Sequence, residues 1–243
     1  MDLFALPPLA LLLDLATRAM LALTSFLDPL AGSAAAALAV VVVTLVVRIV
    51  LIPVGVSQAR AEQSRARLAP RLRMLRERWA RSPERLQRET MQLYRDEGAS
   101  PLAGCLPLLA QAPVVGLLYA VFLHPTVGGH ANELLANQLF GVPLGRSLVD
   151  ALSTGMTDAA TLAVVGTLVA VIALAAEMTR RLLRPSADPA APRWMARLVG
   201  ALHFSAAVVA VFVPVAAGLY LAVTTVWTLA QRLLLRRRYP LPS

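Results

Sequence analysis

A long apolar stretch with a single charge constrains the fold of this chain more than any other feature. Between Asp28 and Arg60 the one charged residue is Arg48. The run from Ala34 to Gln58 is therefore long enough to cross a bilayer core about 30 Å thick. A guanidinium inside that core costs about 2.5–3.5 kcal/mol on insertion scales. Two explanations stay open from this stretch alone: the long Arg48 side chain reaches the nearer membrane surface, or it lines a hydrated groove.

Composition places the whole chain in a membrane. Hydrophobic residues make up 58% of 243 residues and the mean hydropathy is +0.66, values typical of an integral membrane protein. All 23 basic residues are arginine and they flank apolar runs, which favours membrane lipid over DNA as the partner. The single cysteine excludes an intramolecular disulfide. No metal-ligand, phosphate-loop or nucleophile pattern is present, so we expect no catalytic residues, metal site or cofactor.

Charge and apolarity divide the chain into five spans joined by polar segments. The predicted fold class is all-α: a polytopic membrane protein with a five-span helical core, a cytoplasmic helical hairpin and an N-terminal interfacial helix. The expected segments are an interfacial amphipathic helix at 1–33, spans at 34–56, 101–124, 159–179, 198–213 and 214–232, a basic hairpin at 57–100, an external loop at 125–158, a cytoplasmic loop at 180–197 and a basic tail at 233–243.

The first segment carries a polar stripe within an apolar helix. Asp14, Arg18, Ser25 and Asp28 follow helical spacing, which suits a helix lying in the membrane interface. A signal peptide is the alternative, but a basic region before the apolar run is missing and Asp2 stands there instead. We therefore favour the interfacial helix.

The polar segment Ser57–Ser100 predicts two helices outside the bilayer. Leu68, Leu72, Leu75 and Trp79 form one apolar stripe at helical spacing. Ser82-Pro83-Glu84 then has the N-cap, proline and first-turn acid of a second helix. With 11 arginines against six acids this hairpin has a net charge of +5. A solvated loop that only fixes topology is the alternative interpretation.

The last apolar region is too long for one crossing. Between Arg197 and Arg232 lie 34 residues without a formal charge, and a straight helix of that length measures about 51 Å. Pro214 near its middle favours two short spans. With five spans and the N-terminus outside, 20 of the 23 arginines fall on the cytoplasmic side, as the positive-inside rule requires. The C-terminus is then cytoplasmic.

Several polar side chains lie inside the predicted spans. Gln111 lies at about the depth of Arg48 in the second span, and Thr44 lies one turn from Arg48. No carboxylate lies deep in any span to pair with Arg48, so we expect a hydrated cavity whose acidic groups come from another molecule. The last span adds Tyr220, Thr224 and Thr225, each of which is also explained by an ordinary interhelical hydrogen bond.

Three stretches resemble the YidC/Oxa/Alb family of membrane protein insertases. These are the run from Thr44 to Arg48 with Pro53 and Gln58, the segment Pro70–Pro113, and the final span from Pro214 to Trp227. The match is strongest over about 40–123. Thr224 and Thr225 stand where the family usually has a Ser-Asn pair. A large external domain of some members, a methionine-rich loop before the fourth span and an aromatic at Leu221 are missing, which puts client range in doubt.

The resemblance implies a function and a site. It implies an insertase or chaperone of a bacterial plasma membrane, not an enzyme, in which the arginine attracts acidic tails of newly made membrane proteins. It also suggests the ribosome and the Sec translocon as partners. The client-binding groove would comprise Arg48, Thr44, Gln111, Tyr220, Thr224 and Thr225. The main alternative is a small anion transporter or pore, which predicts a repeat architecture or a second buried charge that the sequence lacks. A membrane-embedded enzyme would need paired acids, metal ligands or an activated nucleophile.

Overall fold

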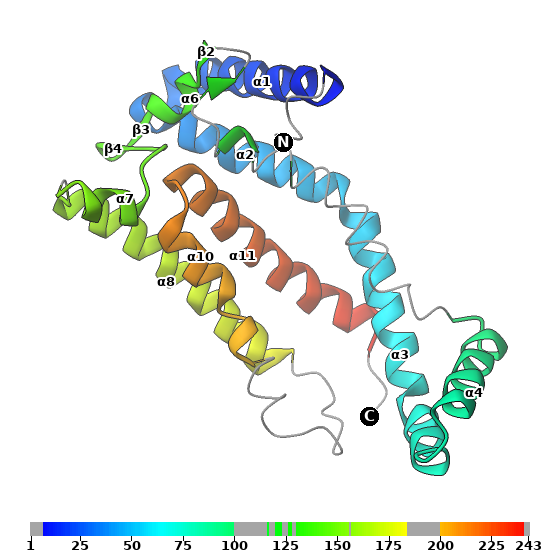
Figure 1. Ribbon diagram of the computed structural model, residues 1–243. Helices are drawn as coiled ribbons and strands as arrows, with labels where there is room; N and C mark the ends of the chain where they lie inside the picture. The colour runs from blue at the N-terminus through cyan, green and yellow to red at the C-terminus, as the bar shows by residue number, and fades with distance from the viewer. Residues whose placement is uncertain are drawn as a thin grey trace. The chain divides into compact units, whose positions relative to one another are not determined.

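The computed structural model describes residues 7–99, 116, 120–122, 126–127, 130–155, 157–183 and 200–240. Its helices are α1 (Pro7–Ala31), η2 (Gly32–Ala34), α2 (Ala35–Val50), α3 (Ile52–Arg78), α4 (Pro83–Asp96), α6 (Glu133–Ala136), α7 (Leu148–Ser153), α8 (Ala159–Leu182), α10 (Ser205–Phe212) and α11 (Val215–Arg238) (Figure 1). Strands of two residues form two antiparallel pairs, β1 (Thr126–Val127) with β2 (His130–Ala131) and β3 (Gln138–Leu139) with β4 (Val142–Pro143). Most of the predicted second span and of the predicted loop 180–197 lies outside the described residues.

Three stretches of the described chain are long and apolar enough to cross a membrane. They are Leu13–Val50, Ala159–Leu182 and Val215–Arg238. The prediction of an all-α polytopic membrane protein is thereby confirmed. The number of spans and the membrane boundaries of the predicted segments stay predictions.

The chain divides into two compact units, which are described separately. The first unit comprises Met1–Ile49 with Pro113–Leu229, and the second comprises Val50–Ala112 with Ala230–Ser243. The candidate groove residues that the structure describes belong to the first unit. The basic hairpin belongs to the second.

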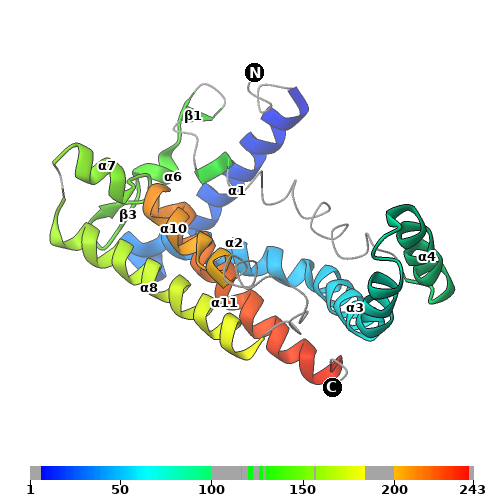
Figure 2. The ribbon, with the colours of Figure 1, turned by 60° about the horizontal axis from the view of Figure 1, so that its bottom comes forward.

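Helix α1 ends at a sharp bend before α2 in the first unit. Gly32 has φ +51° and opens the short helix η2, a conformation that glycine adopts without a steric cost. Leu27 of α1 packs against Ala35 and Ala39 of α2 beside this bend. As one straight helix Leu13–Val50 would measure about 57 Å, nearly twice a bilayer core. The bend fits a crossing helix α2 preceded by a helix that runs in another direction (Figures 1 and 2).

Helices α8, α10 and α11 pack through small side chains. Ile172, Ala207, Ala210 and Ala222 form one buried cluster, and α10 lies beside α8 in both ribbon views. A Cβ at Gly218 would lie 3.2 Å from Leu168 Cδ1, so glycine lets α11 approach α8 closely. Small residues at helix interfaces are typical of membrane proteins because they allow close backbone packing.

The predicted first span, 34–56, contains a helix break. Helix α2 ends at Val50 and α3 begins at Ile52, with Pro53 in its first turn. The proline ring removes a backbone donor and clashes with the carbonyl four residues earlier. The break therefore follows from Pro53. The predicted span 34–56 had no break at this proline.

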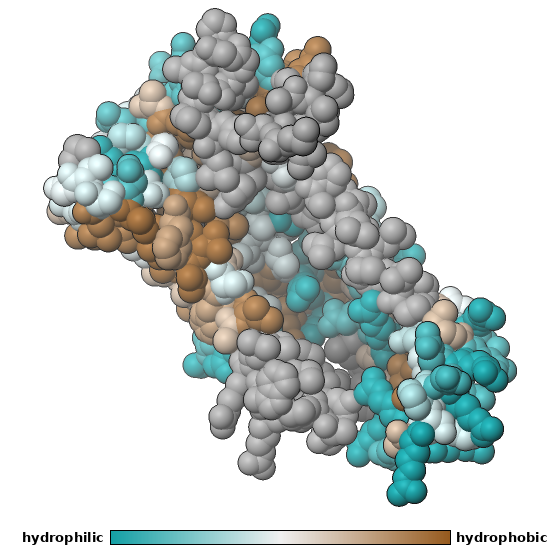
Figure 3. Space-filling view, in the orientation of Figure 1, coloured by the Kyte–Doolittle hydropathy of each residue, from teal (hydrophilic) through white to brown (hydrophobic). Residues whose placement is uncertain are grey.

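The second unit contains a helical hairpin, α3 packed against α4. The predicted start of α4 is confirmed: Ser82 is the N-cap residue, Pro83 lies in the first turn and Glu84 is the first-turn acid. Gly98, with φ +58°, follows the end of α4. Figure 3 shows this hairpin as mainly hydrophilic, whereas the visible surface over α8 and α10 is mainly hydrophobic.

The end of α11 binds the base of α3 within the second unit. Gln231 fills the space beside Gly55, where any Cβ would overlap its carboxamide. Arg236 pairs with Glu62 at 3.4 Å, and Gln63 donates to the Pro240 carbonyl at 3.0 Å. Arg60 donates to the Tyr239 hydroxyl at 3.3 Å. Residues 231–240, called the tail strap below, are thus fixed along one helix of the hairpin.

Candidate functional site

The structure places Arg48 on the side of α2 that faces the core. Thr44, one turn earlier, is 1% exposed, whereas Val46 and Ile49 are 53% and 54% exposed. At 100° per residue, Arg48 lies about 40° from Thr44 and about 160° from Val46. Its side chain is half-buried. Arg48 therefore lies at the edge of the packed face and not on the outward-facing one.

No carboxylate neutralises Arg48 in the part of the chain that the structure describes. The ion pairs of the first unit join Arg18 to Asp14 at 2.8 Å and Glu177 to Arg180 and Arg181. Glu177, near the end of α8, is thus held by two other arginines.

Thr44 and Tyr220 adjoin the same buried core. Tyr220 is 4% exposed and belongs to a cluster that includes Val40 of α2, with Val43 and Val47 packed against it. Its ring lies 6.3 Å from that of Phe122, tilted by 47°. The Thr44 hydroxyl donates to the Val40 carbonyl at 2.6 Å, so its proton is used within its own helix. Thr44 offers only its remaining acceptor capacity to a ligand.

The two threonines of α11 differ from one another. Thr224 lies one turn after Tyr220, and its buried hydroxyl has no hydrogen-bond partner among the described residues. Thr225 donates to the Leu221 carbonyl at 2.8 Å and lies about 140° around the helix from Tyr220. A buried hydroxyl without a partner costs about 1–3 kcal/mol, which water or a bound chain would recover. Thr224 therefore fits a hydrated groove better than Thr225 does.

The sixth predicted groove residue, Gln111, lies outside the described residues. The structure buries Thr44, Tyr220 and the hydroxyl of Thr224 within the first unit, with Arg48 at the edge of the packed face of α2. Among the described residues, no three His, Cys, Asp or Glu side chains gather as metal ligands would.

The loop around 132–147 forms a hydrogen-bonded cap on the beginning of α11. Buried Asn132 donates to the Val121 carbonyl at 2.7 Å and accepts from the Leu134 amide. The first amides of α11, those of Val215 and Ala216, donate to carbonyls of Arg146 and Leu144, each at 3.0 Å. Amides at a helix start have no partner within the helix, so the loop supplies the acceptors. This cap joins three separate parts of the first unit.

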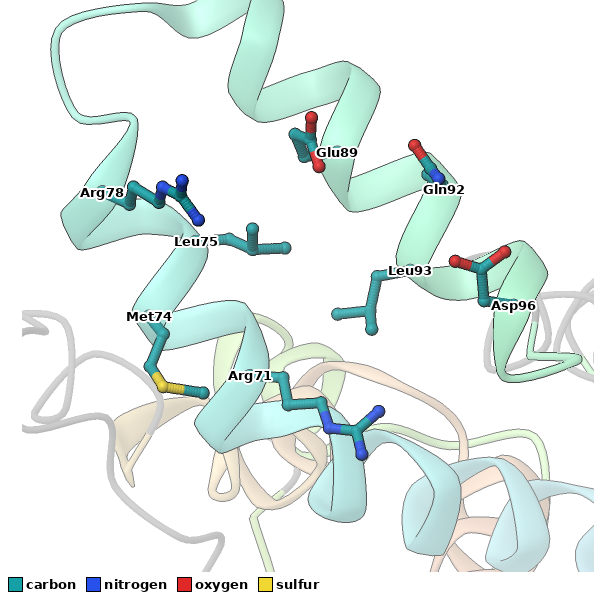
Figure 4. Close-up of a pocket in the computed structure, with 8 residues that line it drawn as sticks. All are labelled: Arg71, Met74, Leu75, Arg78, Glu89, Gln92, Leu93 and Asp96. Carbon is teal, nitrogen blue, oxygen red and sulfur yellow. The ribbon is translucent and has the colours of Figure 1, made fainter.

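The hairpin of the second unit encloses a groove of about 370 Å³ between α3 and α4 (Figure 4). Leu75 and Leu93 point toward one another across it. The wall from α3 is basic and the wall from α4 is acidic. The lining comprises Arg71, Met74, Leu75 and Arg78 of α3, and Glu89, Gln92, Leu93 and Asp96 of α4. Leu68 is the one buried residue of α3, so the apolar contact between α3 and α4 is shallow.

The sequence interpretation missed the cap and the tail strap. Asn132 precedes Glu133 as an N-cap residue precedes a first-turn acid, and Ser147 with Asp150 has the same pattern. These local signals predict short helices in the loop. They do not predict which distant backbone groups the loop binds, because those contacts are made between segments far apart in the chain.

The sequence matches the family described as 60Kd inner membrane protein over residues 26–241. It is 29% identical over 213 residues to the membrane protein insertase YidC of Streptomyces avermitilis, covering 81% of this chain and 50% of that protein. It is 37% identical over 75 residues to YidC of Clostridium perfringens, covering 31% and 32% of the two chains. Over 69 residues it is 45% identical to YidC of Granulibacter bethesdensis, covering 28% and 12%.

These relatives favour the insertase prediction over an anion transporter. The chain spans about half the length of the Streptomyces relative. The family resemblance first noticed in three stretches thus extends over most of the sequence.

Proposed function

The chain belongs to the 60Kd inner membrane protein family, the family of the YidC/Oxa/Alb insertases, and on that premise we propose that it is a membrane protein insertase and chaperone. Its clients are newly made membrane proteins, its site of action is a bacterial plasma membrane, and it carries out no covalent chemistry. The observation that carries the proposal is the match over residues 26–241, together with relatives that are named membrane protein insertases.

The mechanism rests on Arg48 as a fixed positive charge. A cation inside a membrane protein, without a neutralising acid among the described residues, attracts an acidic group from a client. Two unit charges roughly 8 Å apart at an effective dielectric constant of about 20 attract by about 2 kcal/mol. That attraction draws an acidic client tail into the groove while its apolar span moves into lipid. Thr224, Tyr220, Thr44, Gln111 and Thr225 provide the polar surroundings of the tail.

The test measures insertion of one single-span client whose tail charge is varied while its span is kept. We expect Arg48→Ala to lower insertion of acidic tails roughly thirtyfold, the factor that corresponds to about 2 kcal/mol. Neutral tails should insert almost as before. Arg18→Ala is the matched control, because it removes an arginine that is exposed and paired with Asp14.

Equal insertion of acidic and neutral tails by the wild type and by Arg48→Ala would refute the attraction mechanism. If Arg48 only reaches the membrane surface, its removal should be harmless or slightly stabilising, because a charge leaves the bilayer. The half-buried position of Arg48 on the core-facing side of α2 supports the groove instead.

The basic hairpin, in this proposal, engages clients or ribosomes from the cytoplasm. Its net charge of +5 attracts anionic lipid or RNA. Replacement of Arg65–Arg95 by a short polar linker should leave the spans in the membrane and abolish client insertion, as measured with the same client. Full insertion by this variant would mean that the hairpin is only structural. Binding to the Sec translocon is a further partner proposal, which co-purification would test.

A further inference from the structure

The tip of the β3–β4 hairpin has an aromatic residue in a conformation that aromatic residues rarely adopt. Leu139 pairs with Val142, so Phe140 and Gly141 form a two-residue turn, with φ +51° and +82°. Such turns need positive φ at both positions and favour Asn-Gly, because a bulky residue is strained there. Phe140 thus occupies a position where asparagine would cost less free energy.

Packing within the protein does not offset this strain. Phe140 is 77% exposed, whereas Val142 and Leu144, just beyond the turn, are fully buried. The hairpin is therefore anchored by its neighbours and holds the phenylalanine ring away from the core. An exposed ring on a strained backbone needs a partner outside the described chain.

Contacts of the hairpin show which part of the first unit lies beside it. Strand β3 contacts η2, the bend between α1 and α2. Phe26 and Leu30, in the last turns of α1 before this bend, are 74% and 80% exposed. Helix α2 belongs to an apolar stretch able to cross the membrane, and a crossing by α2, as the predicted topology has it, puts the bend before it near a membrane boundary.

We propose that Phe140 is a lipid anchor, inserted at the boundary between headgroups and acyl chains in the leaflet on the side of the Gly32–Ala34 bend. Phe26 and Leu30 continue the same apolar contact on α1. Lipid is the occupant because Phe26 and Leu30, just before the bend that β3 contacts, are further exposed apolar side chains of a membrane protein. A phenylalanine ring also gains free energy when it leaves water. The anchor holds the cap at a fixed depth above α11. The proposal does not depend on insertase activity or on which side of the membrane the bend lies.

The test reads the depth of the hairpin without changing Phe140. A nitroxide is attached to a cysteine at Gln138, an exposed residue of β3, in the full chain with Cys105→Ser and reconstituted in vesicles of phosphatidylcholine and phosphatidylglycerol. Collisions of the label with oxygen, which concentrates in the membrane, are compared with collisions with a water-soluble nickel chelate. A label at Glu133, exposed on α6 of the same cap, gives the aqueous reference.

We expect an excess of oxygen collisions at position 138 over position 133, and loss of that excess with Phe140→Asn. Asparagine suits the turn, so this variant should fold at least as well as the wild type, with an equal or higher thermal midpoint in detergent. Phe140→Leu should keep the excess, because leucine retains the apolar side chain. An aqueous signal at position 138 in the wild type, or no change with Phe140→Asn, would overturn the proposal.

Discussion

At the scale of single residues, charge without a partner is the most informative feature of this chain. Arg48 was recognisable from sequence because a lone charge in an apolar run is costly wherever the run folds. Arg48 lies near the core-facing side of α2 because it follows the buried residue Thr44 by one helical turn. Thr224 and Thr225 were indistinguishable in the sequence, and the structure separates them by the hydrogen bond that only Thr225 makes.

The charge of Arg48 should matter more than the geometry of its guanidinium. Attraction at a distance does not need two parallel hydrogen bonds, so Arg48→Lys should retain much of the insertion of acidic tails. Arg48→Glu should be worse than Arg48→Ala for those tails, through like-charge repulsion in a weakly screened site. Initial insertion rates of the acidic and neutral clients measure both effects. A lysine variant as inactive as the alanine variant would favour a bidentate contact instead.

Asp158 should make the stability of the fold depend on acid pH. Its carboxylate caps α8, accepting from the Thr161 amide at 2.9 Å, and the adjacent side chain and amide of Thr161 lower the pKa of Asp158 from its ordinary value of 3.8. Because the folded pKa is lowered, the stabilisation is present above pH 3.8 and is lost as the pH falls through the folded pKa. Thermal midpoints in detergent between about pH 5 and pH 2 should fall less steeply for Asp158→Asn. If the thermal midpoint falls equally steeply with pH in the wild type and in Asp158→Asn, Asp158 does not contribute to the acid sensitivity of the fold.

At the scale of elements, the sequence predicted where a helix begins more accurately than which residues the helix packs against. The start of α4 at Ser82-Pro83-Glu84 depends on local chemistry, and the structure confirms it. The stripe Leu68, Leu72, Leu75 and Trp79 predicted an apolar face on α3, yet only Leu68 is fully buried. Periodicity reports which residues share a face, but the degree of burial depends on the partner element, and α4 contributes charged residues to the interface.

The tail strap should depend on the absence of a side chain at Gly55. A leucine there would displace the Gln231 carboxamide and loosen the contacts of Arg236 and Tyr239 with α3. We expect Gly55→Leu to speed tryptic cleavage at Arg236–Arg238 several-fold in purified protein. Gly166→Leu is the matched control, because a Cβ at Gly166 meets open space. Unchanged cleavage in Gly55→Leu would mean that the strap is held without this contact.

At the scale of the whole molecule, arginine placement sets the predicted orientation. Composition predicted a multi-pass membrane protein, which the family match and the three apolar helical stretches support. The count of five spans depends on segments outside the described residues and on how Arg197–Arg232 is divided. Pro214 separates the 8-residue helix α10 from the 24-residue helix α11, so the helix breaks at the predicted proline.

Orientation should follow from labelling of single cysteines in a Cys105→Ser chain. Cysteines at Ser82 and Ser186 should be shielded from an impermeant thiol reagent added outside intact cells, whereas one at Gly129 should react. The reason is that five spans with the N-terminus outside put 20 of the 23 arginines on the cytoplasmic side, as the positive-inside rule requires. Labelling at position 82 from outside would overturn the assignment, and lysed cells supply the control that each cysteine is reactive.

The hydrogen bonds from Val215 and Ala216 to the loop carbonyls impose an order on how this protein is itself made. Leu144 and Arg146 leave the ribosome long before the residues that donate to them. Until α11 has been synthesised and inserted, those carbonyls lack their final donors and the cap cannot close. An unfinished chain therefore stays open on that side until the first turn of α11, which carries both donors, is in place.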